Sequence, residues 1–257
     1  MGAIAFTLVE VPFAVDPENP EKNPNPQDSS VHVDWSRIDT VLFDMDGTLL
    51  DLHFDNRFWR ELIPAEYIRC QPDDPECARR RLEDEMQRVR GKLEWYCVDH
   101  WTRFTGLDVL GLKRELAHHV ALKPHAETLL DALHRSGRRR VLVTNAHPKV
   151  YHFKHQLTRI GDHLDTIVSA HDLECAKEDT DFWERLQRVA PYDPARTLLV
   201  DDNLLALASA ARQGLTELRG MRYPDERGEA MDSRDFLLLE SLADLLPGLP
   251  GRKRPST

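Results

Sequence analysis

The stretch of residues 40–50 constrains the fold of this chain more than any other feature. It reads T-V-L-F-D-M-D-G-T-L-L, so an apolar run with strong strand preference ends directly in two carboxylates, Asp44 and Asp46. Gly47 then breaks the run. The pattern predicts a buried strand that stops abruptly and delivers two acids to one edge of a sheet.

Two acids one residue apart need a reason, because each like charge raises the pKa of the other. A bound cation removes that cost, and Mg²⁺ prefers oxygen ligands of this kind. A solvated acidic turn is the alternative reading of any single D-x-D pattern. Here the D-x-D pattern follows a buried strand and is followed by G-T-L-L, and this context favours a metal site.

Downstream of residue 123, predicted strands and helices alternate along the chain. We expect a strand from Leu215, which would lie at the edge of the sheet, and a final helix from Leu237 to Leu246. This alternation with short links predicts an α/β fold with a doubly wound parallel sheet. The other expected strands cover residues 140–146, 165–170 and 197–202, and the other expected helices cover residues 124–137, 148–160, 181–189 and 204–213.

Residues 51–120 have a different character, because apolar residues recur there at helical spacings and no strand pattern interrupts them. We interpret this block as a small all-helical domain inserted after the first strand. Its first helix should start at Asp55-Asn56, which are good N-cap types, and end at Pro64. The expected domains are a flexible tail (1–33), an α/β core (34–50 and 121–246), the helical insertion (51–120) and a C-terminal tail (247–257).

Polar groups follow three of the predicted strands, at the edge where ligands gather in such sheets. Asp44 and Asp46 follow the first, and Lys177 lies in the loop before a predicted helix. The other strand ends carry Thr144-Asn145 and Asp201-Asp202. Each has an ordinary alternative role, since a threonine can cap a strand, a lysine can face solvent, and two acids can cap the next helix.

Taken in order, these residues resemble motifs I to IV of the haloacid dehalogenase-like (HAD) phosphohydrolases, over about residues 39–246. More narrowly, the chain resembles the bacterial GMP/IMP 5′-nucleotidases of that superfamily. The resemblance implies a HAD-like Rossmannoid core, with the helical insertion as its cap domain. The segments that carry it are D-M-D-G-T-L-L-D-L-H-F-D-N-R-F-W, W-Y-C-V-D-H-W, T-N-A-H-P and K-E-D.

The resemblance also implies roles for individual residues. Asp44 would attack phosphorus and form an aspartyl-phosphate, and Asp46 would protonate the leaving alkoxide and later activate water. Thr144 and Asn145 would bind the phosphate. Lys177 would neutralise both the nucleophile and the phosphate.

The same resemblance implies a Mg²⁺ cofactor, which would polarise the phosphoryl group. Asp44, the backbone carbonyl of Asp46, and the pair Asp201-Asp202 would hold it. Asp202 is favoured as the direct ligand, and Asp201 could bind directly or through water. The expected function is a Mg²⁺-dependent phosphomonoesterase for purine monophosphates, that is, a 5′-nucleotidase for GMP and IMP.

Several other functions remain open from the sequence alone. HAD dehalogenases lack the second acid of motif I, so Asp46 argues against that reaction. Sugar phosphomutases keep both acids but often carry valine in place of Thr48, which favours hydrolysis without deciding it. Another small phosphate ester, such as a sugar phosphate, is the main alternative substrate. A non-catalytic binding protein would be expected to have lost one motif acid, and none is lost.

Composition limits the partners of this 257-residue chain, which is 41% hydrophobic and 30% charged. Its net charge of −10 argues against a general nucleic-acid polymer as partner, since that needs a basic face. The sequence shows neither a signal peptide nor an apolar run long enough for a membrane span, so we expect a cytoplasmic protein. The oligomeric state is not predicted. The four cysteines form no C-x-x-C pair and are expected to be free thiols: Cys70, Cys77, Cys97 and Cys175.

Overall fold

Six parallel strands form the sheet at the centre of the protein, in the order β3-β2-β1-β4-β5-β6. The structure, a computed structural model, describes residues 32–72 and 74–249. The strand that carries the D-x-D pattern, β1, lies in the middle, and all four of its residues are buried. The strands are β1 (Thr40–Phe43), β2 (Arg139–Thr144), β3 (Thr166–Ser169), β4 (Thr197–Val200), β5 (Glu217–Met221) and β6 (Leu237–Leu239).

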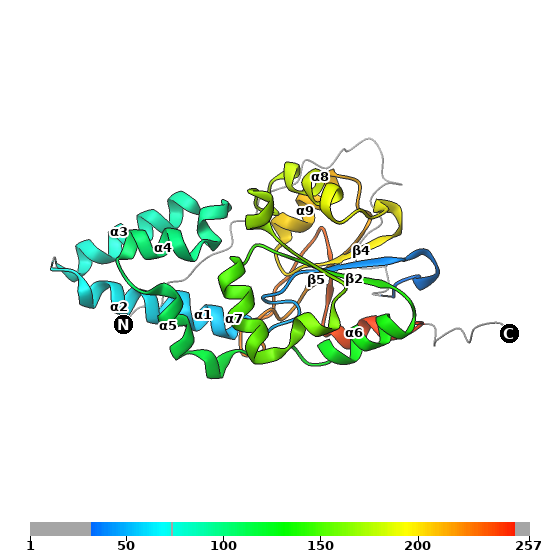
Figure 1. Ribbon diagram of the computed structural model, residues 1–257, viewed down its shortest axis with the longest axis horizontal. Coiled ribbons are helices and arrows are strands. Elements are labelled where there is room, and N and C mark those ends of the chain that lie inside the picture. The colour runs from blue at the N-terminus through cyan, green and yellow to red at the C-terminus, as the bar shows by residue number, and fades with distance from the viewer. Residues whose placement is uncertain (1–31, 73, 250–257) are drawn as a thin grey trace.

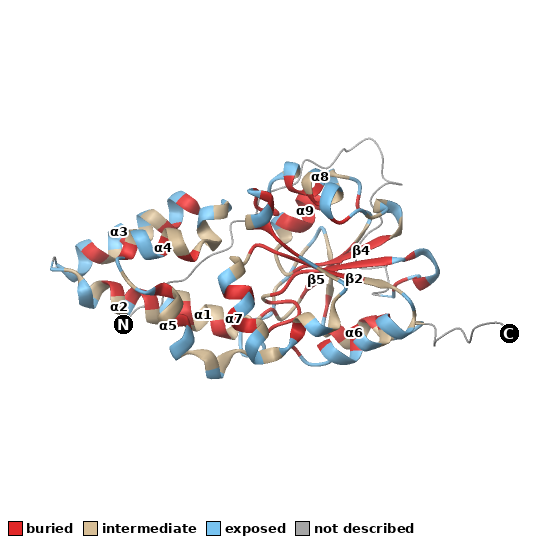
Figure 2. Ribbon diagram, in the orientation of Figure 1, coloured by how far each residue is buried: buried red, intermediate tan, exposed pale blue. Residues whose placement is uncertain are grey.

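Helices cover both faces of this sheet, as a doubly wound fold requires (Figure 1). Alternate residues of β1 serve the two faces: Val41 and Phe43 pack in the same cluster as Leu129, and Leu42 packs in the same cluster as Trp183. Figure 2 shows the resulting band of buried residues through the sheet. The covering helices are α6 (Ala126–Arg135), α7 (Pro148–Thr158), α8 (Thr180–Val189) and α9 (Leu204–Arg212).

Residues 51–120, as far as the structure describes them, form helices and turns without a strand, and this block stands to one side of the sheet (Figure 1). It has a hydrophobic core of its own, in which Phe58 and Trp101 are fully buried. We call this block the helical insertion. Its helices are α1 (His53–Arg57), α2 (Ile63–Cys70), α3 (Pro75–Val89), α4 (Val98–Thr105) and α5 (Val109–Glu115).

The first helix of the insertion departs from the prediction at both ends. It starts at His53, with Asp55 inside the first turn rather than at the N-cap, and it does not end at Pro64. A π-helical turn, Phe58–Leu62, joins α1 to α2, and Pro64 sits in the first turn of α2. The π-helical turn directly before Pro64 interrupts the regular α-helical hydrogen bonding, which is where a residue without an N–H is tolerated.

The C-terminal part of the sheet also differs from the prediction. The helix expected from Leu237 to Leu246 is instead strand β6 followed by a short 3₁₀ helix, Leu242–Leu245. A short run of leucines is ambiguous between helix and strand. Here pairing with β5 decides, because β6 uses the hydrogen bonds that β5 would otherwise leave open. The strand expected from Leu215 is β5, which therefore lies inside the sheet rather than at its edge.

Both ends of the described chain pack on the core. Val33 and Trp35 are buried, and the indole N–H of Trp35 donates to the carbonyl of Pro247 at 3.2 Å. Most of the two predicted tails, residues 1–31 and 250–257, lies outside the described residues. None of the helices that the structure describes is both long enough and apolar enough to cross a membrane.

Candidate active site

The carboxyl ends of β1 and β4 place two acids side by side. Phe43 pairs with Val200 in the sheet, so the next residues, Asp44 and Asp201, leave the two strands at the same level. The backbone N–H of Asp44 still donates to the carbonyl of Val200, at 2.9 Å. The sheet itself therefore fixes the backbone positions of both acids.

Lys177 joins these two acids. Its ammonium group contacts Asp44 Oδ1 closely and donates to Asp201 Oδ2 at 2.6 Å. All three side chains are buried. Burial raises the pKa of Asp44 to about 6, although the charge of Lys177 opposes the change. Burial acts to lower the pKa of Lys177, but the charges of Asp201 and Asp44 outweigh it and raise that pKa.

A third acid, Asp202, completes a group of carboxylates. Asp44, Asp201 and Asp202 each offer an oxygen within 4.8 Å of the others. Burial, together with the charges of Asp44 and Asp201, raises the pKa of Asp202 well above its ordinary value. Three acids face one lysine here, so the group would carry excess negative charge if all three acids were ionised. A set of oxygen donors with this charge suits a hard divalent cation such as Mg²⁺.

Gly47 is needed for Asp202 to approach the loop after β1. A Cβ atom on Gly47 would lie 2.4 Å from Asp202 Oδ2, which is closer than any real contact allows. The φ angle of Gly47 is +90°, a value that side-chain-bearing residues rarely adopt. The glycine of the D-x-D-G-T pattern therefore opens the space in which Asp44 and Asp202 come together.

Asp46 faces a different set of partners. Lys154 from α7 donates to Asp46 Oδ1 at 2.6 Å and to Asp55 Oδ2 at 2.5 Å. Lys113 from α5 donates to the other oxygen of Asp55 at 3.0 Å. Burial raises the pKa of Asp46 to about 6, because the charge of Lys154 offsets only part of the lost solvation. Asp44 and Asp46 are thus held by two separate lysines.

This second group, formed by Asp46, Asp55, Lys113 and Lys154, was not predicted from the sequence. Burial acts to raise the pKa of Asp55, but the charges of Lys154 and Lys113 outweigh it and lower that pKa to about 2. Both lysines are almost fully buried, although each stands among ordinary helical residues in the sequence. Lys154 and Asp55 are 99 positions apart, so no local pattern could have paired them.

The predicted phosphate-binding pair lies beside Lys177. The buried Thr144 hydroxyl accepts the backbone N–H of Ala146 at 3.1 Å. Asn145 Oδ1 accepts the backbone N–H of Lys177 at 3.0 Å, and its Nδ2 donates to Glu178 Oε2 at 2.9 Å. Asn145 therefore positions the loop that carries Lys177.

Glu178 links this loop to the helical insertion. Its Oε1 accepts the hydroxyl of Tyr96 at 2.5 Å and the side-chain amide of Asn203 at 2.8 Å. Tyr96 belongs to the insertion, so this hydrogen bond crosses from the insertion to the core. Glu178 stands in the K-E-D segment of the sequence, but nothing local in that segment indicates this role.

A protein-family model described as haloacid dehalogenase-like hydrolase matches residues 38–214, a span that contains every acid and lysine of the group around Asp44. The chain belongs to this family. Its HAD-like α/β fold, predicted from the sequence, is confirmed. The family match also makes it a hydrolase of the HAD type.

Curated relatives of this HAD-family chain include a nucleotidase. The GMP/IMP nucleotidase YrfG of Escherichia coli is 36% identical over 195 residues, which cover 76% of this chain and 88% of that protein. The pyrophosphatase PpaX of Bacillus velezensis is 25% identical over 223 residues, which cover 82% of this chain and 95% of that protein. The relatives therefore support a phosphatase within the family.

Solved structures of HAD proteins share the fold. A HAD phosphatase from Thermococcus onnurineus aligns with a TM-score of 0.66 at 22% identity, over 84% of this chain and 99% of that one. CbbY from Rhodobacter sphaeroides, in complex with phosphate, aligns with a TM-score of 0.54 at 19% identity, over 82% of this chain and 99% of that one. At these identities the likeness concerns the fold alone.

Proposed function

We propose that this HAD hydrolase is a Mg²⁺-dependent 5′-nucleotidase that cleaves purine monophosphates, GMP and IMP, through an aspartyl-phosphate on Asp44. The observation that carries the proposal is the separation of the two motif acids. Asp44 lies with Lys177, Asp201 and Asp202, whereas Asp46 is held by Lys154. This separation supports a role for Asp44 in attack on a phosphoryl group and a role for Asp46 in proton transfer.

The reaction would run in two steps. In the first, an Asp44 oxygen bonds to phosphorus, the bond from phosphorus to the leaving oxygen breaks, and Asp46 gives that oxygen its proton. In the second, Asp46 takes a proton from water while the water oxygen bonds to phosphorus and the bond to Asp44 breaks. Lys177 compensates negative charge on Asp44 and the phosphate, and Thr144 donates to a phosphoryl oxygen.

The cluster of three carboxylates, Asp44, Asp201 and Asp202, fits Mg²⁺. Asp44, Asp202 and the backbone carbonyl of Asp46 would be the ligands. Asp201 would act on the ion less directly, because its Oδ2 accepts from Lys177 and its Oδ1 accepts the backbone N–H of Asn203 at 2.9 Å. When bound, the ion supplies positive charge that polarises the phosphoryl group.

Substrate choice would be made by the helical insertion, acting as a cap over the core site. Of its aromatic residues, Phe54, Phe58 and Trp101 are fully buried, whereas Trp95 and Tyr96 are only half-buried. The half-buried rings could stack on a purine, at about 1–3 kcal/mol per base. Support for a 6-oxopurine comes from the relative named GMP/IMP nucleotidase.

The test is phosphate release from IMP, GMP, AMP, CMP, UMP and ribose 5-phosphate, each with Mg²⁺ and with excess EDTA. We expect kcat/KM for IMP and GMP to exceed the others by at least about tenfold, equivalent to roughly 1.4 kcal/mol. EDTA should abolish activity and Mg²⁺ should restore it, while Asp44→Asn should be inactive under all conditions. Equal rates for ribose 5-phosphate and IMP would reduce the proposal to a general phosphatase. Full turnover in EDTA would overturn the metal's role.

A further inference from the structure

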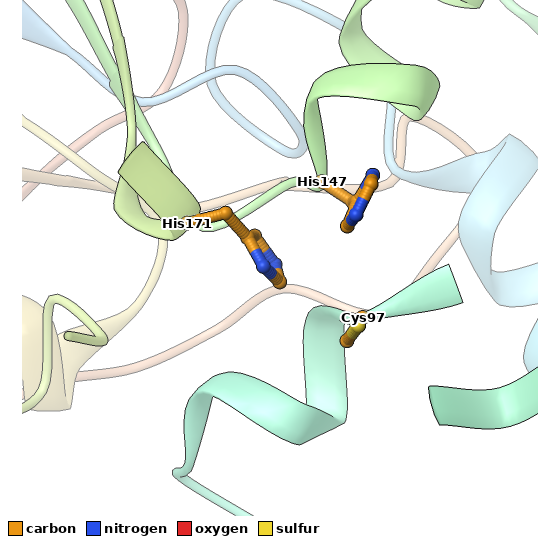
Figure 3. Close-up of side chains that lie close together, drawn as sticks. All are labelled: Cys97, His147 and His171. Carbon is orange, nitrogen blue, oxygen red and sulfur yellow. The ribbon is translucent and has the colours of Figure 1, made fainter. Parts of the chain in front are cut away.

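Three side chains with metal-binding chemistry meet beside the active site, from three separate segments. His147 precedes α7, His171 follows β3, and Cys97 precedes α4 in the helical insertion. Figure 3 shows the three side chains facing one another. One donor atom from each lies within 4.8 Å of the others, and the two imidazole rings are 4.7 Å apart between centroids. Neither the family nor the proposed hydrolysis accounts for this group.

The two histidines are suited to bind a cation through a neutral ring. Burial, followed by the charge of His147, lowers the pKa of His171 to about 4, and burial also lowers the pKa of His147. Both rings are therefore uncharged near neutral pH. The buried Nε2 of His171 has no hydrogen-bond partner among residues 32–72 and 74–249. A buried polar atom without a partner is costly, and a ligand bound between the two rings would satisfy it.

We propose that Cys97, His147 and His171 form a binding site for Zn²⁺. One thiolate and two imidazoles are ligands that Zn²⁺ prefers, and a water molecule would occupy the fourth position. Zinc ligands lie about 2.0–2.3 Å from the ion, so the three side chains would have to draw slightly closer than they are here. Binding releases the thiol proton of Cys97 and leaves both imidazoles neutral.

His147 exchanges one of its present contacts when the ion binds. Its Nδ1 accepts the backbone N–H of Lys149 at 3.2 Å, and its Nε2 lies 3.7 Å from Asp99 Oδ2. Both contacts are replaceable, since Lys149 and Asp99 are well exposed and also pair with each other at 2.6 Å. Water can therefore satisfy these groups when His147 turns toward the ion.

The proposed zinc site lies where the helical insertion meets the core, so zinc bound there would affect turnover. Cys97 directly follows Tyr96, whose hydroxyl donates to Glu178, next to Lys177. A zinc ion bound here would tie the insertion to the core at the loops that carry the catalytic groups. Zinc should therefore slow turnover by restraining movement of the insertion. This consequence, unlike the binding itself, depends on the proposed function.

Cobalt substitution tests the site without any assay of activity. For this test Cys70 and Cys77 are first replaced by serine, because both thiols are exposed and would also bind metal. The protein with these two substitutions is called the parent. Titration with Co²⁺ in excess Mg²⁺ should produce thiolate-to-cobalt absorption in the near ultraviolet and the visible bands of a tetrahedral ion, at one equivalent. Added Zn²⁺ should remove both signals.

Three variants of the parent separate zinc binding from packing. Cys97→Ser should lose the thiolate band, and His171→Ala should weaken Zn²⁺ binding by at least about tenfold, since even residues that only support metal ligands contribute that much. His134→Ala, at an exposed histidine of α6, should bind like the parent. Absence of the thiolate band in the parent, or its persistence in Cys97→Ser, would overturn the site and leave the cluster as packing alone.

Inhibition is measured separately, with Mg²⁺ in excess. Zinc should slow hydrolysis by the parent at concentrations that leave Cys97→Ser at its own zinc-free rate. Equal inhibition of both proteins would place the inhibitory ion at the carboxylates and overturn the proposed restraint. Because the cobalt spectra need no substrate, they decide the zinc site even if the protein hydrolyses none of the proposed nucleotides.

Discussion

At the level of single residues, the loop after β1 separates two carboxylates that are neighbours in the sequence. Asp44 turns toward Lys177, whereas Asp46 turns toward Lys154. Gly47 follows directly, and its missing side chain admits Asp202. In the proposed mechanism, the nucleophile, the proton donor and the glycine that makes room for a metal ligand would therefore fall within four residues.

Asp46→Asn should slow the cleavage of some esters more than others, depending on their leaving group, whereas Asp44→Asn should not. Removing a general acid costs about 10²–10⁴-fold, but a leaving group of low pKa such as p-nitrophenolate needs little protonation. Single-turnover release of the leaving group should therefore fall much further for a nucleoside monophosphate than for p-nitrophenyl phosphate. Asp44→Asn is the control and should abolish the first step for both esters. Equal losses for both esters in Asp46→Asn would contradict its role as the acid.

Gly47→Ala should abolish activity without unfolding the protein. The new Cβ would displace Asp202, and the φ angle of +90° adds backbone strain of about 1 kcal/mol. Gly106→Ala is a matched control, because its φ angle is +73° and nothing lies within 4 Å of the added atom. Both variants should lose similar stability in urea denaturation, but only Gly47→Ala should lose Mg²⁺-dependent turnover. Normal turnover in Gly47→Ala would contradict the placement of Asp202.

At the level of elements, α1 and α5 of the insertion reach the core through buried charges. Asp55 of α1 accepts from Lys113 of α5 and from Lys154 of α7. Lys113 also lies 4.0 Å from the centre of the Phe58 ring, within reach of a cation–π interaction. A change in the insertion can therefore reach Asp46 through Lys154.

Asp55→Asn should destabilise the protein strongly. It leaves Lys113 and Lys154 buried with one carboxylate fewer, and breaking a buried ion pair typically costs about 3–5 kcal/mol. The free energy of unfolding, measured in urea, should fall by an amount of that order. Asp39→Asn is the control, since Asp39 is largely exposed and its partner Arg196 is partly exposed, and it should change stability little. If both substitutions changed the free energy of unfolding by a similarly small amount, the ion pairs of Asp55 with Lys113 and Lys154 would contribute little to stability.

An element can be predicted from the sequence when residues close in the chain determine it, and not when contacts with distant segments do. β1, β2 and β4 were predictable because each is an apolar run that ends in a polar residue, and α9 because Gly214 ends its helical pattern. The structure of residues Leu237 to Leu246 was not predictable in this way, because only pairing with β5 makes part of this segment a strand.

The same distinction holds for the site. Asp44, Thr144, Lys177 and the pair Asp201-Asp202 form an ordered set of strand-end and loop positions, which sequence alone can reveal. Lys154, Asp55 and Glu178 act through contacts between distant segments, for which the sequence carries no local signal.

At the level of the whole molecule, the sheet and the insertion divide the work that we propose. The ends of β1, β2 and β4 and the Lys177 loop supply the phosphate chemistry, and the insertion faces them through Tyr96, Asp55 and Cys97. If the proposal holds, the reacting groups and the substrate-reading groups lie on separate parts of the chain, which would let one HAD core serve relatives named for different substrates.

The proposed mechanism depends on a covalent phosphoryl group on Asp44. Its most direct test uses Asp46→Asn, because loss of the residue that activates water should let the intermediate accumulate. The variant is mixed with p-nitrophenyl phosphate and Mg²⁺, quenched in acid within the first turnover, and digested for mass spectrometry. We predict one phosphoryl group on the peptide of residues 40–50, at Asp44, removed by hydroxylamine as an acyl phosphate is and absent from the Asp44→Asn/Asp46→Asn double variant. Release of one equivalent of p-nitrophenolate with no phosphoryl group on Asp44, or with the group on another residue, would contradict the account.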